Sequence, residues 1–493
     1  MASLDEIREA RLKKLGILKA AGMNPYPIET EHDFDLATVR TDFETLAKTG
    51  KEVALAGRVM AVRGQGAILF VPLFDGTMQG SPSTFQAVFK KDSMDETSFK
   101  LFSDVADIGD IISVKGELFT TQKGENSVLV KSWTMLAKTL RPLPEKWSGL
   151  QDVEERFRNR FLDTLMSAEV RERFMIRSRM ITAFRSVLDK AGYLEVETPQ
   201  LQPLAGGTNA APFKTHHNAL DIDLFLRIAP ELYLKKLLIG GFPKVYEIGR
   251  NFRNEGIDVT HNPEFTMLEF YEAFSTAAKQ MDFVEAMIRD VVKSVLNSPV
   301  VKSEEGDIDF SKPFNRISYR DLVQKDAGFD PVTVDRATAE AKAKKMGIKV
   351  EDGDSKDRIV DNIYKKASRV NIVEPTFITD YPVDMLPLAK KSEKDPSVVD
   401  VFQLVVGGME LVKAFSELND PIDQRERFSK EEDNAKKGDK EAQPNDLEFV
   451  EALEYGMPPA GGVGIGMDRL AMLLTGTKNI KEVILFPTMR PRA

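Results

Sequence analysis

The feature that most constrains this chain is residues 250–271, RNFRNEGIDVTHNPEFTMLEFY, in which charged and aromatic side chains follow two alternating segments. Residues 244–253 and 264–271 alternate in the manner of half-buried strands. The connection between them contains residues that are typical of turns: Asn254, Gly256, Asn262 and Pro263. The pattern predicts two neighbouring strands of an antiparallel sheet.

Successive side chains of a strand point to opposite faces, so Phe265, Met267, Glu269 and Tyr271 share one face of the second strand. This face offers an aromatic ring, a carboxylate and a phenol in a row. Arg253 ends the first strand with a planar set of donors that suits a phosphate. The segment predicts a phosphate-binding site beside an acidic pocket, although a single arginine in a sheet more often forms an ordinary surface ion pair.

Residues 250–271 resemble motif 2 of the class II aminoacyl-tRNA synthetases, and the wording RNFRNEG to HNPEFTMLE is similar to that of the lysyl-tRNA synthetases. Residues 174–201 resemble motif 1, the dimer-forming helix and strand, with Gly192 ending the helix. Residues 461–474, GGVGIGMDRLAMLL, resemble motif 3, a glycine-rich strand that leads into a helix. In that helix Asp468 is predicted to cap the first turn, and Arg469 lies near the positive end of the helix dipole. The three motifs occur in the order that the family requires.

Composition sets limits that agree with this resemblance. A chain of 493 residues with 42% hydrophobic residues is long enough for two or three domains with sizeable cores. The absence of cysteine excludes disulfides and thiolate metal sites, and no apolar stretch approaches the roughly 20 residues that span a bilayer. The N-terminal segment lacks the apolar core of a signal peptide, so we expect a cytoplasmic protein.

The basic residues of this N-terminal segment predict either a solvated helix face or an RNA-binding face: Arg8, Arg11, Lys13, Lys14 and Lys19.

Residues 50–140 contain five short alternating runs, which predict a small β-barrel of the oligonucleotide-binding (OB) type. The resemblance implies that this barrel binds the tRNA anticodon, with Phe70 stacking on a base and Gln86 and Glu125 bonding base edges. Phe70 fits a core position equally well on pattern alone. The sequence departs from the family at Ala67, where a lysine is usual, and in a lengthened loop over residues 76–84.

We therefore expect an α+β protein in which a five-stranded OB-type barrel precedes a class II catalytic domain with an antiparallel sheet flanked by helices. The expected parts are an N-terminal helical extension over residues 1–48, the anticodon-binding domain over 49–140 and a linker over 141–165. The catalytic domain spans 166–493, with a helical insertion at about 275–370. The resemblance to motif 1 implies a homodimer.

The resemblance implies that lysine is the amino acid, held by carboxylates because a pocket with several buried carboxylates is suited to a cation. Glu269 and Glu417 are expected to pair with its terminal ammonium, and Glu231 with its α-amino group. Alternation places Lys413, Phe415 and Glu417 on one strand face. The full set of expected lysine-binding residues is Gly207, Glu231, Arg253, Glu269, Tyr271, Lys413, Phe415 and Glu417. An alternative is that Glu269 and Glu417 pair with internal arginines.

For ATP, the resemblance assigns Arg253 to the α-phosphate, Arg469 to the γ-phosphate and Phe265 to stacking on adenine. Arg253 and Arg469 are the expected catalytic residues, because an ionised carboxylate attacks phosphorus without a general base once the phosphate charges are neutralised. The expected ATP-binding residues are Arg253, Glu255, His261, Asn262, Phe265, Glu410 and Arg469. His216 and His217 lie in a family loop near the substrate and are assigned no catalytic role.

The resemblance also implies Mg²⁺, with Glu410 and the residue at position 403 as ligands. Gln403 stands where the family usually has a glutamate, so we expect weaker metal affinity. Lys413 stands where an asparagine is usual, and it pairs either with the substrate carboxylate or with Glu417. The expected partners are tRNA(Lys), ATP and L-lysine, with no membrane. The activity implied is lysine–tRNA ligation, and the alternative is a catalytically weak or silent paralogue that binds nucleic acid through the barrel.

Overall fold

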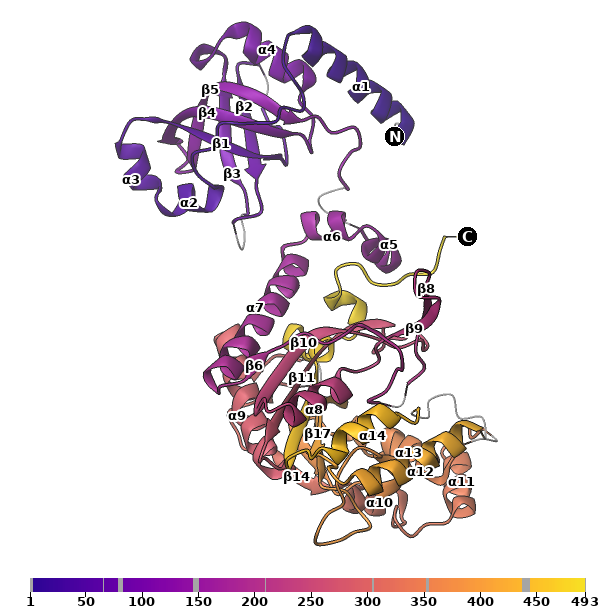
Figure 1. Ribbon diagram of the computed structural model, residues 1–493. Helices are drawn as coiled ribbons and strands as arrows, with labels where there is room; N and C mark the ends of the chain where they lie inside the picture. Colours follow the sequence, from indigo (N-terminus) through magenta and orange to yellow (C-terminus); the bar gives the residue numbers. More distant parts are fainter. Residues whose placement is uncertain are drawn as a thin grey trace. The chain divides into compact units, whose positions relative to one another are not determined.

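The computed structural model describes residues 3–64, 66–78, 83–144, 150–208, 210–303, 306–351, 354–436 and 444–492. The chain divides into two compact units, Met1–Arg171 and Glu172–Ala493, whose elements are labelled in Figure 1. Within the described ranges, no helix is long and apolar enough to cross a membrane.

The N-terminal unit is built on a closed barrel with the strand order β1-β2-β3-β5-β4. Its strands are β1 (Glu52–Val59), β2 (Ile68–Phe74), β3 (Phe85–Lys90), β4 (Ile111–Thr120) and β5 (Asn126–Ala137). Leu69, Val71 and Leu73 point into the barrel, because alternate residues of β2 are buried. The helix α4 (Glu96–Val105) covers the core with Phe102, whose ring stacks on Phe89 with centroids 3.9 Å apart. The predicted five-stranded barrel is confirmed.

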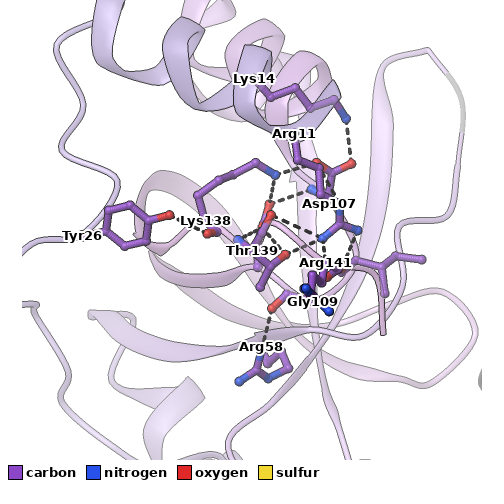
Figure 2. Close-up of polar contacts among 11 residues, drawn as sticks. Arg11, Lys14, Tyr26, Arg58, Asp107, Gly109, Lys138, Thr139 and Arg141 are labelled. Atoms are coloured by element: carbon purple, nitrogen blue, oxygen red, sulfur yellow. Dashed lines mark hydrogen bonds and ion pairs between the residues drawn. The ribbon is translucent and has the colours of Figure 1, made fainter. Parts of the chain in front are cut away.

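The N-terminal helix α1 (Leu4–Ala20) is tied to this barrel by its basic residues, as Figure 2 shows. The guanidinium of Arg11 is buried and donates to the hydroxyl of Thr139 over 2.6 Å. The ammonium of Lys14 lies 2.7 Å from the carboxylate of Asp107, which also pairs with Lys138. Two members of the basic set therefore anchor the helix, and they are not available as an RNA-binding face. The other helices of this unit are α2 (Leu36–Thr41), α3 (Phe43–Lys48), η1 (Lys91–Ser93), α5 (Val153–Arg158) and α6 (Arg160–Met166).

The C-terminal unit is organised around an eight-stranded sheet with the order β14-β15-β16-β17-β18-β11-β10-β6. The strands are β6 (Leu194–Glu195), β10 (Lys244–Phe252), β11 (Glu264–Ala273), β14 (Asn315–Ser318), β15 (Thr376–Thr379), β16 (Val401–Val406), β17 (Met409–Ser416) and β18 (Ala460–Gly466). The six strands from β15 to β10 are antiparallel, as predicted, while β14 and β6 pair in parallel at the two edges.

Helices bury the apolar residues of this sheet. The long helix α7 (Ala168–Lys190) contributes Met180, Phe184 and Leu188, which recur at helical spacing. Gly192, with φ +81, then turns the chain into β6. The helices α9 (Ala277–Leu296) and α15 (Met467–Thr475) belong to the same core, and α8 (Glu231–Ile239) contacts β10 and β11.

The segment predicted as a helical insertion at about 275–370 is mainly helical, but its N-terminal part, up to β14, belongs to the central core. The helix α9 packs against β17 and β18, and β14 joins the central sheet. Between α9 and β14 lies the short hairpin β12 (Val300–Val301) and β13 (Ile308–Asp309). A separate cluster of buried residues forms around α10 (Tyr319–Ala327), α11 (Arg336–Lys345) and α12 (Lys356–Ala367). The remaining elements are β7 (Leu201–Gln202), β8 (Lys214–His217), β9 (Ile222–Leu226), η2 (Arg369–Asn371), η3 (Val383–Met385), α13 (Pro421–Lys436), α14 (Leu447–Glu454) and η4 (Ile480–Val483).

Candidate active site

Three neighbouring strands form the floor of the candidate site, and the middle one is made largely of glycine. In the register of the sheet, Gly464 of β18 lies between Glu269 of β11 and Lys413 of β17. Gly462 lies likewise between Tyr271 and Phe415. Because glycine has no side chain, other groups can approach the backbone of β18 closely. At Gly462 the space of a side chain is taken by Glu417 and Tyr271, whereas at Gly464 the nearest atom would be 3.2 Å from a Cβ.

A cavity of about 360 Å³ lies over this floor, which is a volume suited to a small ligand. It brings together almost all of the predicted site residues, from strands and loops far apart in the sequence. The predicted residues that line it are Gly207, Glu231, Arg253, Glu255, His261, Asn262, Phe265, Glu269, Tyr271, Glu410, Lys413, Phe415 and Arg469. Of the residues predicted to bind lysine, ATP or metal, two, Gln403 and Glu417, do not line the cavity.

One end of the cavity is acidic, and its carboxylates have an internal cation. Lys235 is completely buried, and its ammonium lies 2.6 Å from Glu231 one helical turn earlier in α8. The same ammonium forms an ion pair with Glu417, which is also buried. The other oxygen of Glu417 lies so close to Gly462 that a Cβ atom there would be 1.9 Å from it. The carboxylate of Glu417 therefore lies against Gly462, on the face of the sheet that carries Tyr271 and Phe415.

These ion pairs keep a cation and a carboxylate at the acidic end although burial opposes both charges. Burial raises the pKa of Glu417 well above its ordinary value, and Lys235 opposes that rise. Burial opposes the charge of Lys235, but Glu231 and Glu417 raise its pKa above the ordinary value. One alternative from the sequence was that Glu417 pairs with an internal arginine. In the structure its internal partner is a lysine, Lys235.

Glu269 is the carboxylate in the middle of the cavity. Burial, and then the nearby charge of Glu231, raise its pKa to about 8. The hydroxyl of Tyr271 donates to Glu269 over 3.2 Å, and this contact with Arg253 nearby limits the rise. The pKa of Tyr271 is itself raised well above its ordinary value by burial and by the surrounding carboxylates. Glu269 is therefore poised to lose a proton when a cation arrives.

The other end of the cavity is cationic. The guanidinium carbon of Arg253 lies 4.9 Å from the centre of the Phe265 ring, a cation–π contact. Arg469 donates to the backbone oxygen of Glu410 over 3.1 Å and lies 3.1 Å from Nε2 of His261. Since an arginine only donates, Nε2 accepts, and Nδ1 of His261 donates to Asp258 over 2.9 Å. The two arginines are thus held in place by a ring, a carbonyl and a neutral histidine.

Asp468 was predicted to cap the helix that follows β18, and this prediction is wrong. The helix α15 begins after Gly466 without a side-chain cap. Asp468 instead accepts a hydrogen bond from the backbone N–H of Thr266 over 2.7 Å and forms an ion pair with Arg177. A buried carboxylate is stabilised by a cation and a hydrogen-bond donor, and through these two partners Asp468 links α7, β11 and α15.

Two backbone features complete the cavity wall. Gly207 has φ +97, and a Cβ atom there would lie 3.2 Å from Cβ of Ala229 and from Cβ of Glu231. The position therefore requires glycine and brings the backbone close to the acidic end. Asn262 is buried, donates to the backbone oxygen of Glu264 and leaves its own Oδ1 without a donor within the part of the chain that the structure describes.

The two predicted metal ligands do not form a metal site together. Oε1 of Gln403 accepts a hydrogen bond from the hydroxyl of Tyr381 over 2.7 Å. Among the residues described, no group of three or more histidine, aspartate or glutamate side chains is arranged to hold a metal ion. Glu410 lines the cavity and Gln403 does not, so the donor set does not fit a metal ion held by this chain.

His216 and His217, which were assigned no catalytic role, lie on β8 as exposed residues and do not line the cavity. His216 contacts Asp223 over 3.1 Å and is a local feature of a hairpin.

In the barrel, Phe70 is 36% exposed and faces outward between the buried Leu69 and Val71, so it is not a core residue. Gln86 of β3 shares this outward face because it pairs with Pro72 of β2, two residues beyond Phe70. Its side-chain amide donates to Ser127 over 2.9 Å. Glu125 is exposed in the turn that precedes β5. Ala67 is exposed just before β2, and residues 79–82 of the lengthened loop lie outside the described residues.

Some residues of the site were missed from the sequence. Lys235 was not predicted, although its position four residues after Glu231 on a helix is a signal for an ion pair. The segment Met385, Leu386, Pro387 and Leu388 also lines the cavity. It has no strand or helix periodicity that would have revealed it.

Comparison with known proteins agrees with this geometry. Residues 152–490 match the family model of class II tRNA synthetases (D, K and N), and residues 53–136 match that of the OB-fold nucleic acid binding domain. The chain is 47% identical over 490 residues to the lysine–tRNA ligase of Carboxydothermus hydrogenoformans, covering 99% of both chains. It is 45% identical to that of Syntrophomonas wolfei, covering 100% of this chain and 98% of the relative. It is 46% identical to that of Moorella thermoacetica, covering 99% and 98%.

Proposed function

The chain belongs to the class II tRNA synthetases and, within them, to the lysine–tRNA ligases, and from this premise we propose how its cavity carries out the reaction. The protein activates lysine with ATP and transfers the lysyl group to the 3′ end of tRNA(Lys). One observation carries the proposal: a single cavity has an acidic end beside a cationic end.

The acidic end matches the charge of lysine. It contains three carboxylates, Glu231, Glu269 and Glu417, and one buried cation, Lys235. The charge of Lys235 balances one of the three carboxylates, which leaves two negative charges without a positive partner. Free lysine carries two ammonium groups, which match these two charges. We assign the side-chain ammonium to Glu269 and Glu417 and the α-ammonium to Glu231. Tyr271 adds a hydrogen bond, Phe415 lines the aliphatic stem, and Gly207 gives the backbone room to approach the substrate.

Aspartate or asparagine would leave these carboxylates without a positive partner. A buried charge without a partner is costly, and a site built to pair a polar group rejects analogues that lack it by about four orders of magnitude. The acidic end therefore favours lysine over the other amino acids that this class of synthetases activates.

The cationic end suits the nucleotide. Phe265 offers its ring to the adenine, and the guanidinium of Arg253 contacts that ring. We therefore assign the adenine base and the α-phosphate to neighbouring positions in the cavity. Arg469, supported by His261 and Glu410, is assigned to the γ-phosphate. Glu255 and Asn262 complete the set that faces the nucleotide.

The first step follows from these charges. The lysine carboxylate is ionised at neutral pH, so its oxygen attacks the α-phosphorus without a general base. A bond forms between that oxygen and phosphorus, the bond to pyrophosphate breaks, and lysyl-adenylate remains. Arg253 stabilises the charge on the α-phosphate, and Arg469 stabilises the departing pyrophosphate. In the second step a terminal ribose hydroxyl of tRNA attacks the activated carbonyl, and AMP leaves.

Enzymes of this family generally use ATP with Mg²⁺. Because Glu410 is the only one of the two predicted ligands that lines the cavity, we propose that Mg²⁺ enters as part of the ATP substrate. No step above depends on a metal ion held by the protein.

For the barrel we propose recognition of the tRNA anticodon, with Phe70 stacking on a base and Gln86 and Glu125 reading base edges. Their common location on the outward face of β2, β3 and the turn before β5 supports this assignment. We also propose that the protein acts in the cytoplasm as a homodimer. Sedimentation tests the dimer, and a monomer at micromolar concentration would contradict it.

Lysine-dependent exchange of pyrophosphate into ATP tests the function directly. The purified protein is assayed without tRNA, with aspartate, asparagine and ornithine in place of lysine as controls. Exchange with lysine alone is expected, because only lysine compensates both carboxylates at the correct length. No exchange with any amino acid would contradict the proposal and would favour the alternative of a catalytically silent paralogue. The full-length similarity to lysine–tRNA ligases does not favour that alternative.

A further inference from the structure

Lys413 occupies a central position in the sheet of the C-terminal unit. Its neighbour on one side is Gly464, beyond which lies Glu269. Its neighbour on the other side is Gln403 of β16. Since Gly464 has no side chain, nothing from β18 stands between Lys413 and the space above Glu269. The lysine is therefore at the border between the acidic and the cationic end of the cavity.

An irregularity in β17 brings a carboxylate onto the same face. The register shifts between Leu404 and Val405 of β16, so that Lys413 pairs with Gln403 while Glu410 pairs with Val405. Gln403 and Val405 are two residues apart on β16 and therefore share a face of the sheet. Their partners on β17, Lys413 and Glu410, share that face too, although they are three residues apart. Both Glu410 and Lys413 consequently line the cavity.

The ammonium of Lys413 is not engaged within the protein. Its side chain forms no ion pair or hydrogen bond with any residue in the described parts of the chain. Glu417, one of the two partners expected for Lys413, is paired with Lys235. Gln403 is neutral, and Tyr381 already donates to its carbonyl oxygen. The lysine is left as a positive charge that faces the cavity.

Together with the function proposed above, on which this inference rests, these contacts assign a role to Lys413. We propose that its ammonium is a cation built into the reacting centre, contacting the lysine carboxylate and the ATP α-phosphate as they react. The ammonium of Lys413 takes the place of a metal ion, because Gln403 and Glu410 do not form a site that could hold one. It is in that sense a catalytic residue, because it touches both reacting groups.

The chemistry needs such a charge. A carboxylate and a phosphate repel each other as the new carbon–oxygen–phosphorus linkage forms, and a cation between them lowers this repulsion. The ammonium keeps its proton throughout: one oxygen–phosphorus bond forms, the bond to pyrophosphate breaks, and no proton passes to or from Lys413. A lysine on a strand is in position before the substrates arrive, whereas a metal ion must first bind.

The test compares nucleotide binding with and without metal in the complete protein. Titration calorimetry measures the binding of α,β-methylene-ATP, an analogue that cannot release pyrophosphate, in saturating lysine with either Mg²⁺ or EDTA. The wild type is compared with Lys413→Asn, with the double variant Gln403→Glu/Lys413→Asn, and with Lys325→Asn. Lys325 is exposed on α10 and does not line the cavity, so its variant removes the same charge elsewhere.

We expect the wild type and Lys325→Asn to lose less than about tenfold in affinity when Mg²⁺ is removed. Lys413→Asn is expected to weaken binding in EDTA by about tenfold or more. The double variant, which has two carboxylates on this face, is expected to depend on Mg²⁺ by about a hundredfold. Lys413→Gln serves as a second variant if the asparagine variant does not fold.

Equal loss on metal removal in the wild type and the double variant would overturn the proposal, as would wild-type affinity of Lys413→Asn in EDTA. Neither result depends on turnover. A failure of the proposed function is seen separately, as the absence of lysine-dependent exchange by the wild type.

Discussion

The ammonium of Lys235 forms an ion pair with the carboxylate of Glu417, and both side chains are buried. The two residues belong to α8 and to the segment after β17, and the same ammonium pairs with Glu231. The pocket that we propose for the substrate lysine is therefore anchored by a lysine of the protein. Without it, two carboxylates would face each other across an interior from which water is excluded.

Replacing Lys235 by methionine tests this anchor. The variant leaves Glu231 and Glu417 buried without their cation, which costs about 3–5 kcal/mol in the free energy of unfolding. Urea unfolding followed by circular dichroism measures it. Lys236→Met is the matched control, because Lys236 is half-buried and lies 4.0 Å from Glu448 at the surface. It should lose less than about 1 kcal/mol, and equal losses in the two variants would contradict the prediction.

Lysine binding should release a proton from Glu269. Its pKa of about 8 means that the carboxyl group is mostly protonated at pH 7 in the free protein, and the incoming ammonium favours the ionised form. Affinity for lysine should therefore rise with pH from 7 to above 8. Calorimetry at pH 7 in two buffers with different ionisation enthalpies measures the released proton as a difference in observed enthalpy.

The variant Glu269→Gln is the control for this proton, since its amide oxygen can still accept from Tyr271 but cannot titrate. Identical enthalpies in both buffers for the wild type would show the assignment to be wrong. The same shift affects stability: the folded state binds more protons than the unfolded state between the unfolded pKa of about 4.3 and the folded pKa of about 8. The contribution of Glu269 to stability is thus present below that interval and is lost as the pH rises through it.

Gly462→Ala should abolish lysine binding. Its Cβ atom would lie 1.9 Å from Oε1 of Glu417 and 2.4 Å from the Tyr271 ring, so these two side chains, which we assign to the substrate, must move. Gly466→Ala, on the same strand, is the comparison, because its nearest contacts, the Arg469 side chain and the backbone oxygen of Leu411, are both 3.8 Å away. Equilibrium titration with lysine distinguishes them. Similar affinities in the two variants would mean that the floor beneath the substrate is not critical.

Strand alternation was enough to predict much of the site. Glu269 and Tyr271 share a face of β11 because they are two residues apart, and the same rule correctly grouped Lys413 with Phe415. Alternation depends only on the local backbone, so it is visible in the sequence. The five runs of the barrel were visible for the same reason.

The rest depended on contacts that local patterns do not contain. Glu410 is three residues from Lys413, a spacing that puts two residues on opposite faces of a regular strand. Only the register shift between β16 and β17 places both on the cavity. Asp468 has the local pattern of a helix cap, but Arg177 and the N–H of Thr266 offer it stronger partners. Tertiary contacts decided both cases.

The role of the barrel can be separated from that of the cavity by Phe70→Ala. Loss of one base-stacking ring should cost about 1 kcal/mol or more, which corresponds to about a fivefold rise in the KM for tRNA. Ile68→Ala is the control, because Ile68 is 37% exposed on the same face of β2 but has no aromatic ring. Aminoacylation kinetics measure the KM, and lysine-dependent pyrophosphate exchange without tRNA should be unchanged in both variants. A KM for tRNA that rises equally in both would mean that the face contacts RNA by its apolar surface alone, and an unchanged KM in Phe70→Ala would remove this residue from the anticodon site.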